Sequence, residues 1–268
     1  MYYISTLKLF LGFISENKIT QVSASLAYYL TMTFFPCIIV VYSLLGNDLD
    51  ALYKIVEFAD SLLPNDMLGI VREYLLYIDT EHRSLMLPLG GILLLSYASA
   101  ALRSFYSSIG KVQGGTDTSG IRSFVESIFY SVILLALFYL LLLSITFGRG
   151  LAEKIICLLP GGSFVLRQGI MRYFILFAMV FSSLLLLYHL PKRKHDDYKI
   201  CFGACLSAGG IVSISPCFSY FIENSIKYSL VYGSMASIIL LMFWLYLCCL
   251  VICTGGVFNI FLYKVKKP

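Results

Sequence analysis

The residues that perform hydrolytic chemistry in enzymes are few in this chain and lie far apart. The three histidines, His82, His189 and His195, fall in three different regions. Metal-assisted or acid–base hydrolysis needs carboxylates or histidines gathered at one point. No phosphate-binding loop of the Walker type and no nucleophile elbow is present in the sequence. We therefore expect that the protein is not an enzyme and uses no cofactor.

The cysteines do not form a metal-binding pattern either. Of the eight, only Cys157 lies in a polar loop; the others lie in apolar segments, where a thiol behaves as a small hydrophobic group. The spacings 201/205 and 249/253 place thiols one helical turn apart, but no histidine or second pair completes a zinc set. The sequence predicts no metal site and no disulfide between extramembrane cysteines.

Hydroxyl groups recur along one apolar segment, residues 23–46, which contains no charged residue. Residues four apart share one face of a helix, so Ser23, Ala27 and Thr31 align on one side. Small residues at that spacing allow a second helix to approach closely. Pro36, near the middle, removes a backbone hydrogen bond and is expected to kink the helix.

The same features return in two later segments, 200–222 and 233–262, and two interpretations stay open. The first is tight packing of a helix bundle; the second is a set of discontinuous helices around a cavity near the membrane midplane. In the second interpretation, the expected cavity-lining residues are Tyr28, Tyr29, Thr31, Ser207, Tyr220, Ser237 and Tyr246. The residues expected at kinks and close helix contacts are Pro36, Gly203, Gly210, Pro216, Gly233 and Gly255.

Two charged residues, Arg103 and Glu126, lie near the ends of apolar segments. They form a possible charged site if both point into the bundle, because ionisable groups inside a membrane are costly and usually functional. Alternatively, both reach the aqueous surface with their side chains.

Composition identifies the elements that must position these residues. The chain is 59% hydrophobic and 13% charged, with a mean hydropathy of +0.84, whereas charged residues average about a quarter of a soluble domain. Long apolar runs, rather than ten-residue alternations, indicate helices and not a β-barrel. The prediction is an all-α polytopic membrane protein, residues 1–268 forming one integral membrane domain. Its six expected spans are about 23–46, 85–109, 124–147, 171–190, 200–222 and 233–262.

The connections complete the expected topology. Residues 1–22 are predicted to form an interfacial amphipathic helix. Lysines and arginines are more numerous in the connections on the side of the N-terminus, so both termini are expected in the cytoplasm. This distribution also explains the net charge of +5 without nucleic-acid binding. Residues 47–84 are predicted to form an acidic, amphipathic helical hairpin on the outer face, either a solvated lid or a gate that attracts cations.

Four stretches of the chain resemble the YihY/BrkB family of bacterial inner-membrane proteins, once misnamed ribonuclease BN. They are SASLAYYLTMTFFP, SYASAALRSFYSSIGKVQG, LPKRKHDDYKICFGACLSA and VYGSMASIILLMFWLYLCCLVICTGGVFN. The residues that match the first and last family motifs are Ala27, Tyr28, Tyr29, Phe35, Pro36, Tyr232, Gly233, Ser234, Trp244, Tyr246, Gly255 and Asn259. The family often has Gly-Ala-Glu near the end, where this chain has Gly255, Gly256 and Val257, so a role that needs that carboxylate does not carry over.

The resemblance implies a multi-pass protein of the bacterial cytoplasmic (inner) membrane with cytosolic termini. It also suggests transport of a lipid-like or ionic substrate. We therefore expect a secondary transporter or flippase-like permease whose partners are membrane lipids and such a substrate. The alternative is a membrane scaffold or envelope assembly factor that transports nothing.

Overall fold

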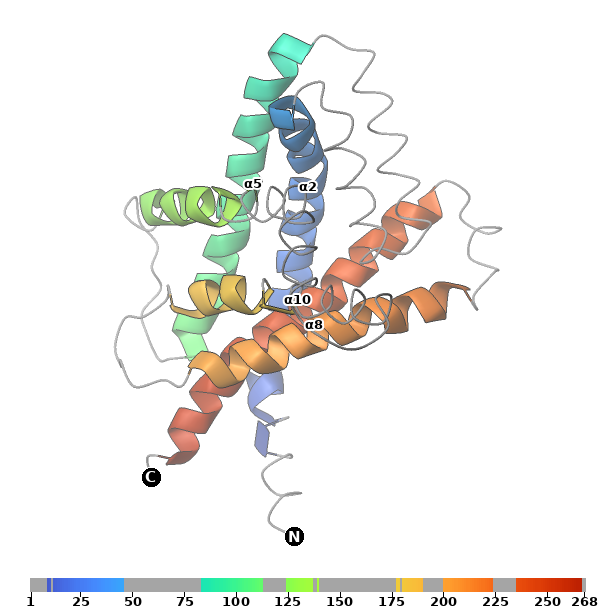
Figure 1. Ribbon diagram of the computed structural model, residues 1–268. Helices are drawn as coiled ribbons and strands as arrows, with labels where there is room; N and C mark the ends of the chain where they lie inside the picture. The colour runs from blue at the N-terminus through green and yellow to red at the C-terminus, as the bar shows by residue number, and fades with distance from the viewer. Residues whose placement is uncertain are drawn as a thin grey trace, which may run out of the picture.

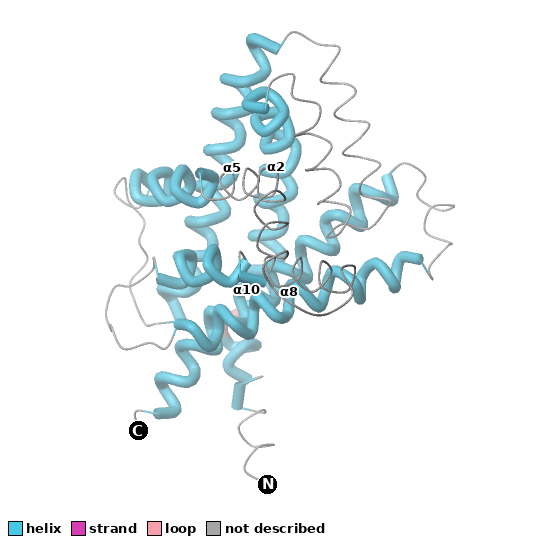
Figure 2. Tube along the Cα trace, viewed as in Figure 1, coloured by secondary structure: helices cyan, strands magenta, loops and turns pink. Residues whose placement is uncertain are grey.

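The fold consists of helices that pack side by side. The computed structural model describes residues 9–10, 12–45, 83–112, 124–136, 139, 177–178, 180–189, 200–223 and 235–266. The long helices are α2 (Ile19–Leu45), α5 (Arg83–Val112), α8 (Ile200–Glu223) and α10 (Met235–Lys266). Two shorter apolar helices cover Phe124–Ala136 and Val180–His189. No strand occurs among these described residues (Figure 2).

Within the described part of the chain, four helices are long and apolar enough to cross a membrane. They are Ile19–Leu44, Leu87–Val112, Ile200–Ile222 and Ala236–Leu262, each longer than the roughly 20 residues that a bilayer core requires. They correspond to four of the six expected spans. Within the other two, 124–147 and 171–190, the shorter helices are described; the expected hairpin at 47–84 lies almost wholly outside the described residues.

The boundaries of three helices differ from the expected ones, and α10 continues to Lys266 instead of ending near residue 262. α2 begins at Ile19 instead of residue 23, and α5 continues to Val112 instead of ending near residue 109. A short helical segment, residues 12–16, precedes α2, and a turn at Asn17 and Lys18 separates the two. The extra residues include the polar side chains of Thr20, Gln21 and Lys111, and hydropathy alone does not reveal that a helix continues past the apolar run.

The three long helices that contain a proline are continuous, and α5 runs on through Pro88. α2 runs on through Pro36 and α8 runs on through Pro216. Two threonine hydroxyls of α2 donate hydrogen bonds to backbone carbonyls of the same helix. Thr31 Oγ1 donates to the carbonyl of Ala27 at 2.8 Å, and Thr33 Oγ1 donates to that of Tyr29 at 2.7 Å. Such internal hydrogen bonds allow a hydroxyl to remain in an apolar environment.

Helix α10 holds the assembly together. It contacts α2, α8 and α5, while α2 and α5 form a long antiparallel pair (Figure 1). α8 and α10 cross in front of this pair, and the start of α2, the end of α5, the start of α8 and the end of α10 lie toward the same end of the molecule as the two termini (Figure 1). The buried core lies at that end and includes Ile19, Phe105, Cys253 and Val257.

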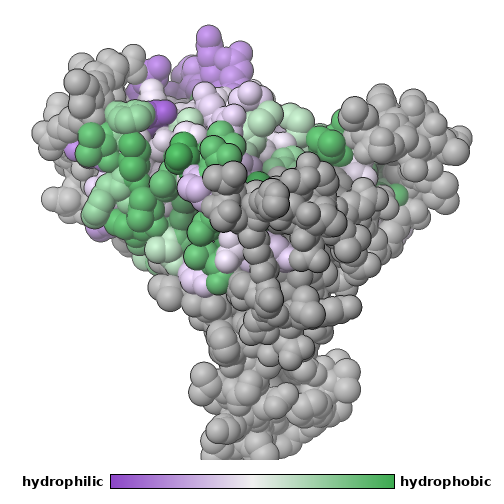
Figure 3. Space-filling model, turned by 90° about the horizontal axis from the view of Figure 1, so that it is seen from above, coloured by the Kyte–Doolittle hydropathy of each residue, from purple (hydrophilic) through white to green (hydrophobic). Residues whose placement is uncertain are grey.

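The outer surfaces of the long helices are apolar. Large exposed side chains include Met32 on α2, Leu93 on α5, Phe202 on α8 and Ile239 on α10. Figure 3 shows hydrophobic residues over a broad part of the described surface, with hydrophilic residues gathered along one edge. This distribution is typical of helices that face lipid.

Candidate functional site

A turn at Asn17 and Lys18 comes directly before α2, next to a group of polar side chains. The Asn17 side chain donates to the carbonyl of Phe13 at 2.7 Å, and the N–H of Lys18 donates to that of Ser15 at 3.1 Å. Lys18 has φ = 52°, a left-handed conformation that costs a non-glycine residue about 1–2 kcal/mol. Its carbonyl accepts hydrogen bonds from the N–H groups of Gln21 and Val22 at 3.0 and 3.2 Å, and these bonds start α2.

Helix α5 turns a polar face toward this part of α2. Ser104, Ser107, Ser108 and Lys111 recur at spacings of three and four residues and therefore share one side of the helix. The hydroxyl groups of Ser25 on α2 and Ser104 on α5 form a hydrogen bond of 3.2 Å. This bond joins the two helices one to two turns inside their ends.

A pocket of about 470 Å³ lies between these two polar faces. Its lining residues are Glu16, Asn17, Lys18, Gln21, Val22, Ser25, Ser104, Ser107, Ser108, Lys111 and Val112. In this described lining, ammonium, amide and hydroxyl groups outnumber the one carboxylate, that of Glu16, and lysine side chains only donate hydrogen bonds. The arrangement is suited to binding oxygen atoms that carry negative charge.

A second polar cluster lies where α8, α10 and the helix Val180–His189 meet, and it is fully packed. The Tyr188 hydroxyl donates to the carbonyl of Ile252 at 2.6 Å and lies 2.9 Å from the hydroxyl of Ser207. Ser207 donates to the carbonyl of Val251 at 3.0 Å and has no exposed surface. These bonds link the three helices where they cross.

Asn259 extends the same crossing toward the start of α8. Its Oδ1 accepts a hydrogen bond from the N–H of Gly203 at 2.8 Å, and its Nδ2 donates to the carbonyl of Ile200 at 3.3 Å. A Cβ atom at Gly203 would collide with Asn259 and with the carbonyl of Gly255. Gly203 and Gly255 therefore allow the two backbones to touch, and the Asn259 amide satisfies backbone groups at a helix start.

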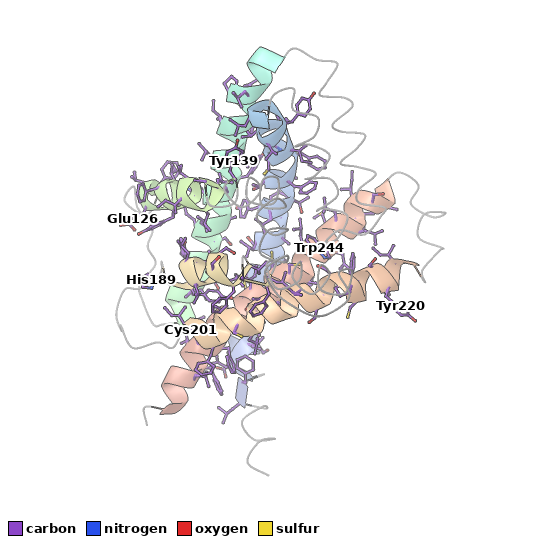
Figure 4. The ribbon with its side chains drawn as sticks, viewed as in Figure 1. Glu126, Tyr139, His189, Cys201, Tyr220 and Trp244 are labelled. Carbon is purple, nitrogen blue, oxygen red and sulfur yellow. The ribbon has the colours of Figure 1, made fainter. Side chains whose placement is uncertain are left out.

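The structure does not gather the expected cavity-lining residues around one space. Tyr28 is 47% exposed and Tyr220 is 71% exposed; Tyr220 points away from the molecule near the far end of α8 (Figure 4). Thr31 is buried against its own helix, and Ser207 belongs to the packed crossing. Tyr29, Ser237 and Tyr246 are half-buried.

The residues expected at kinks and close contacts have varied surroundings. Gly210 faces the side chain of Val251, where an added Cβ would approach Cγ1 to 2.7 Å. Gly203 and Gly255 lie at the crossing of α8 and α10. Pro216 is exposed and Pro36 is buried, and Gly233 lies outside the described residues.

Arg103, one of the two charged residues expected at a possible charged site, lies at a contact between α5 and the helix Phe124–Ala136. The guanidinium of Arg103 lies over the ring of Phe124, 4.7 Å from its centroid, a cation–π contact. Glu126, half-buried, follows two residues later on the same helix (Figure 4). Among the described residues, no group of three or more His, Cys, Asp or Glu side chains could hold a metal ion.

The polar pocket was missed by sequence reasoning, although its signal is present. The relevant residues of α5 lie in the stretch SYASAALRSFYSSIGKVQG, one of the four that resemble the family. The spacing of Ser104, Ser107, Ser108 and Lys111 within it predicts a polar helix face. The partner face on α2 could not be recognised, because Lys18 and Gln21 precede the apolar run and were assigned to an interfacial helix.

Long apolar helices with a polar pocket at one end define the class of a polytopic α-helical membrane protein. The chain belongs to the virulence factor BrkB family, whose sequence model matches residues 10–268. A ribonuclease-like protein of Bacillus subtilis (strain 168), YfkH, is 27% identical over 264 residues, covering 91% of this chain and 90% of that protein. No solved structure matches the chain. The expected family resemblance is thereby confirmed.

Proposed function

We propose that this protein is a secondary transporter or flippase-like permease for a lipid-like or anionic substrate. In this proposal it lies in a bacterial cytoplasmic membrane with both termini in the cytoplasm, and it performs no catalysis. The observation that carries the proposal is the pocket of about 470 Å³ between α2 and α5. If these two helices served only the stability of the fold in lipid, apolar side chains that filled this space would make the fold more stable.

The position of the pocket supports a role in substrate entry. It lies at the end of α2 and α5 that is shared with the termini, where spanning helices reach the aqueous boundary. Its walls belong to helices whose outer sides expose large apolar residues such as Met32 and Leu93. An amphiphile can therefore place a polar group between the helices while its apolar part remains against their outer surfaces.

The packed crossing of α8 and α10 favours the alternative, a scaffold that transports nothing. Ser207, Tyr188 and Asn259 use their polar atoms on neighbouring protein groups. Gly203 and Gly255 leave no space between the backbones. A bundle built in this way throughout would hold partners or maintain shape without opening a path.

Reconstitution into liposomes distinguishes the two functions. Purified protein is tested for movement of fluorescent phospholipids between leaflets and for fluxes of inorganic ions. A pocket-filling variant, Ser104→Leu with Ser108→Leu, is expected to abolish most of the movement. Ser96→Leu is the matched control, since Ser96 is exposed on the same helix and its hydroxyl donates to the carbonyl of Leu93.

The outcomes separate cleanly. Movement by the wild type and the control, with loss in the pocket-filling variant, supports the permease. Equal movement by all three proteins places the route elsewhere and contradicts the role of the pocket. Folded wild-type protein that moves none of the tested lipids or ions favours the scaffold.

A further inference from the structure

The charges around the α2–α5 pocket select the class of ligand that fits it. Among the lining residues that the structure describes, Lys18 and Lys111 carry positive charge and Glu16 carries the one negative charge, and all three side chains are exposed. Farther in, the pocket is lined by the half-buried hydroxyls of Ser25 and Ser104. A dianionic or monoanionic oxyanion satisfies both kinds of donor, because it accepts several hydrogen bonds and carries the opposite charge.

The size of the pocket matches a headgroup and exceeds what a simple ion needs. Small-molecule sites range from about 300 to 1,000 Å³, and this pocket has about 470 Å³. A phosphate with its attached glycerol or ethanolamine fits such a space. Glu16 at the rim does not favour a bare anion, but it is compatible with a headgroup that has hydroxyl or amino groups next to its phosphate.

The location of the pocket favours a lipid as the source of the phosphate. The pocket opens where two apolar helices end, and its inner hydroxyl pair lies between them, not on a loop in water. Basic side chains at this depth meet the headgroup layer of a membrane, where anionic lipids attract them. A soluble nucleotide would make no use of the exposed apolar outer sides of α2 and α5, which include Met32 and Leu93.

We propose that the α2–α5 pocket binds the phosphate ester of a phospholipid headgroup, with Lys18 and Lys111 at the mouth and Ser25 and Ser104 at the inner end. The turn at Asn17 positions Lys18, whose left-handed backbone directs the chain from the N-terminal helix into α2. Only the statement that this lipid is the transported substrate rests on the proposed function. Binding itself can be measured without transport.

Binding is measured on the purified full chain in detergent by native mass spectrometry. The probes are phosphatidylglycerol, diacylglycerol with the same acyl chains but no phosphate, and glycerol phosphate. The test variant is Lys18→Gly with Lys111→Gln; glycine suits the left-handed backbone at position 18, so the charge is lost without strain. Lys18→Arg with Lys111→Arg keeps both positive charges at the same positions and serves as the control.

The wild type and the control are expected to bind phosphatidylglycerol well above diacylglycerol. The test variant is expected to lose about tenfold in affinity, since each exposed ion pair contributes a factor of about two to five. Competition by glycerol phosphate supports recognition of the phosphate itself. Equal binding of phosphatidylglycerol and diacylglycerol, or an unchanged affinity in the test variant, overturns the proposal. Binding of glycerol phosphate without the lipid overturns the lipid source.

The liposome assay then separates the two proposals. In one outcome, the lysine variant loses lipid binding and the wild type moves no lipid. This outcome supports the headgroup site and contradicts the permease. In the opposite outcome, the wild type moves lipid and the lysine substitutions do not change lipid binding. This outcome supports the permease and contradicts the headgroup site.

Discussion

At the scale of single residues, two glycines stabilise the crossing of α8 and α10, because a larger side chain at either position would hold the helices apart. Gly203 and Gly255 let α8 and α10 touch, and Asn259 and Ser207 supply the hydrogen bonds across the contact. Such close approach is the usual way in which helices associate in lipid, where no hydrophobic driving force acts between them. The glycine at 209, on the same helix, meets no atom within 4 Å of an added Cβ.

This difference gives a matched pair of substitutions. Gly203→Ala is expected to lower the free energy of unfolding by about 1–3 kcal/mol, because its methyl group collides with the backbone of α10. Gly209→Ala is expected to leave stability unchanged or slightly raised. Thermal unfolding in detergent measures both. If the two variants unfold at the same temperature, α8 and α10 do not cross at Gly203.

At the scale of elements, α2 and α5 form a pair held together at two levels. Gly90 lies against Ile39, where an added Cβ would approach Cγ2 to 3.0 Å. Toward the other end, the hydroxyls of Ser25 and Ser104 meet at 3.2 Å. The polar pocket begins beyond that hydroxyl pair, so the register of the two helices decides its shape.

A cross-link tests that register. In a variant without native cysteines, Ser25→Cys with Ser104→Cys is expected to form a disulfide quickly under mild oxidation, because the side-chain oxygens that the sulfurs replace are in contact. Ser25→Cys with Ser96→Cys is the control, since Ser96 lies about two helical turns from Ser104. Gel mobility without reductant reports the bond. Equal cross-linking of both pairs, or of neither, contradicts the register.

The sequence allows prediction of long helices far better than of their contacts. Hydropathy alone predicts four of the described helices, α2, α5, α8 and α10, because an uninterrupted apolar run is sufficient to identify a span. The pocket depends on Ser25, Ser104 and Lys111, which come from distant segments, and on the turn at Lys18. Nothing in either segment alone specifies that its polar face meets the other, so this pairing could not be predicted.

The sequence also does not predict which way the tyrosine side chains face. Tyr28 and Tyr220 were selected as cavity-lining residues because they carry hydroxyls within apolar helices, yet both are largely exposed. A helix offers several faces, and a residue type does not tell which face turns inward.

At the scale of the whole molecule, the arrangement combines a closed part and an open part. The crossing of α8 and α10 is packed, while α2 and α5 separate at the end near the termini and enclose polar space. Ser104 in the pocket and Ser99 in the core lie on the same helix five residues apart. Ser99 is only 2% exposed and donates to the carbonyl of Ser96.

The accessibility of these two positions to water tests the central claim, that a polar pocket opens between α2 and α5. In membranes that contain a variant without native cysteines, Ser104→Cys and Ser99→Cys are each treated with a membrane-impermeant maleimide from the side of the termini. We predict that Ser104→Cys reacts many times faster than Ser99→Cys, and that both react equally after denaturation. Reaction of Ser104→Cys as slow as that of Ser99→Cys would contradict the account.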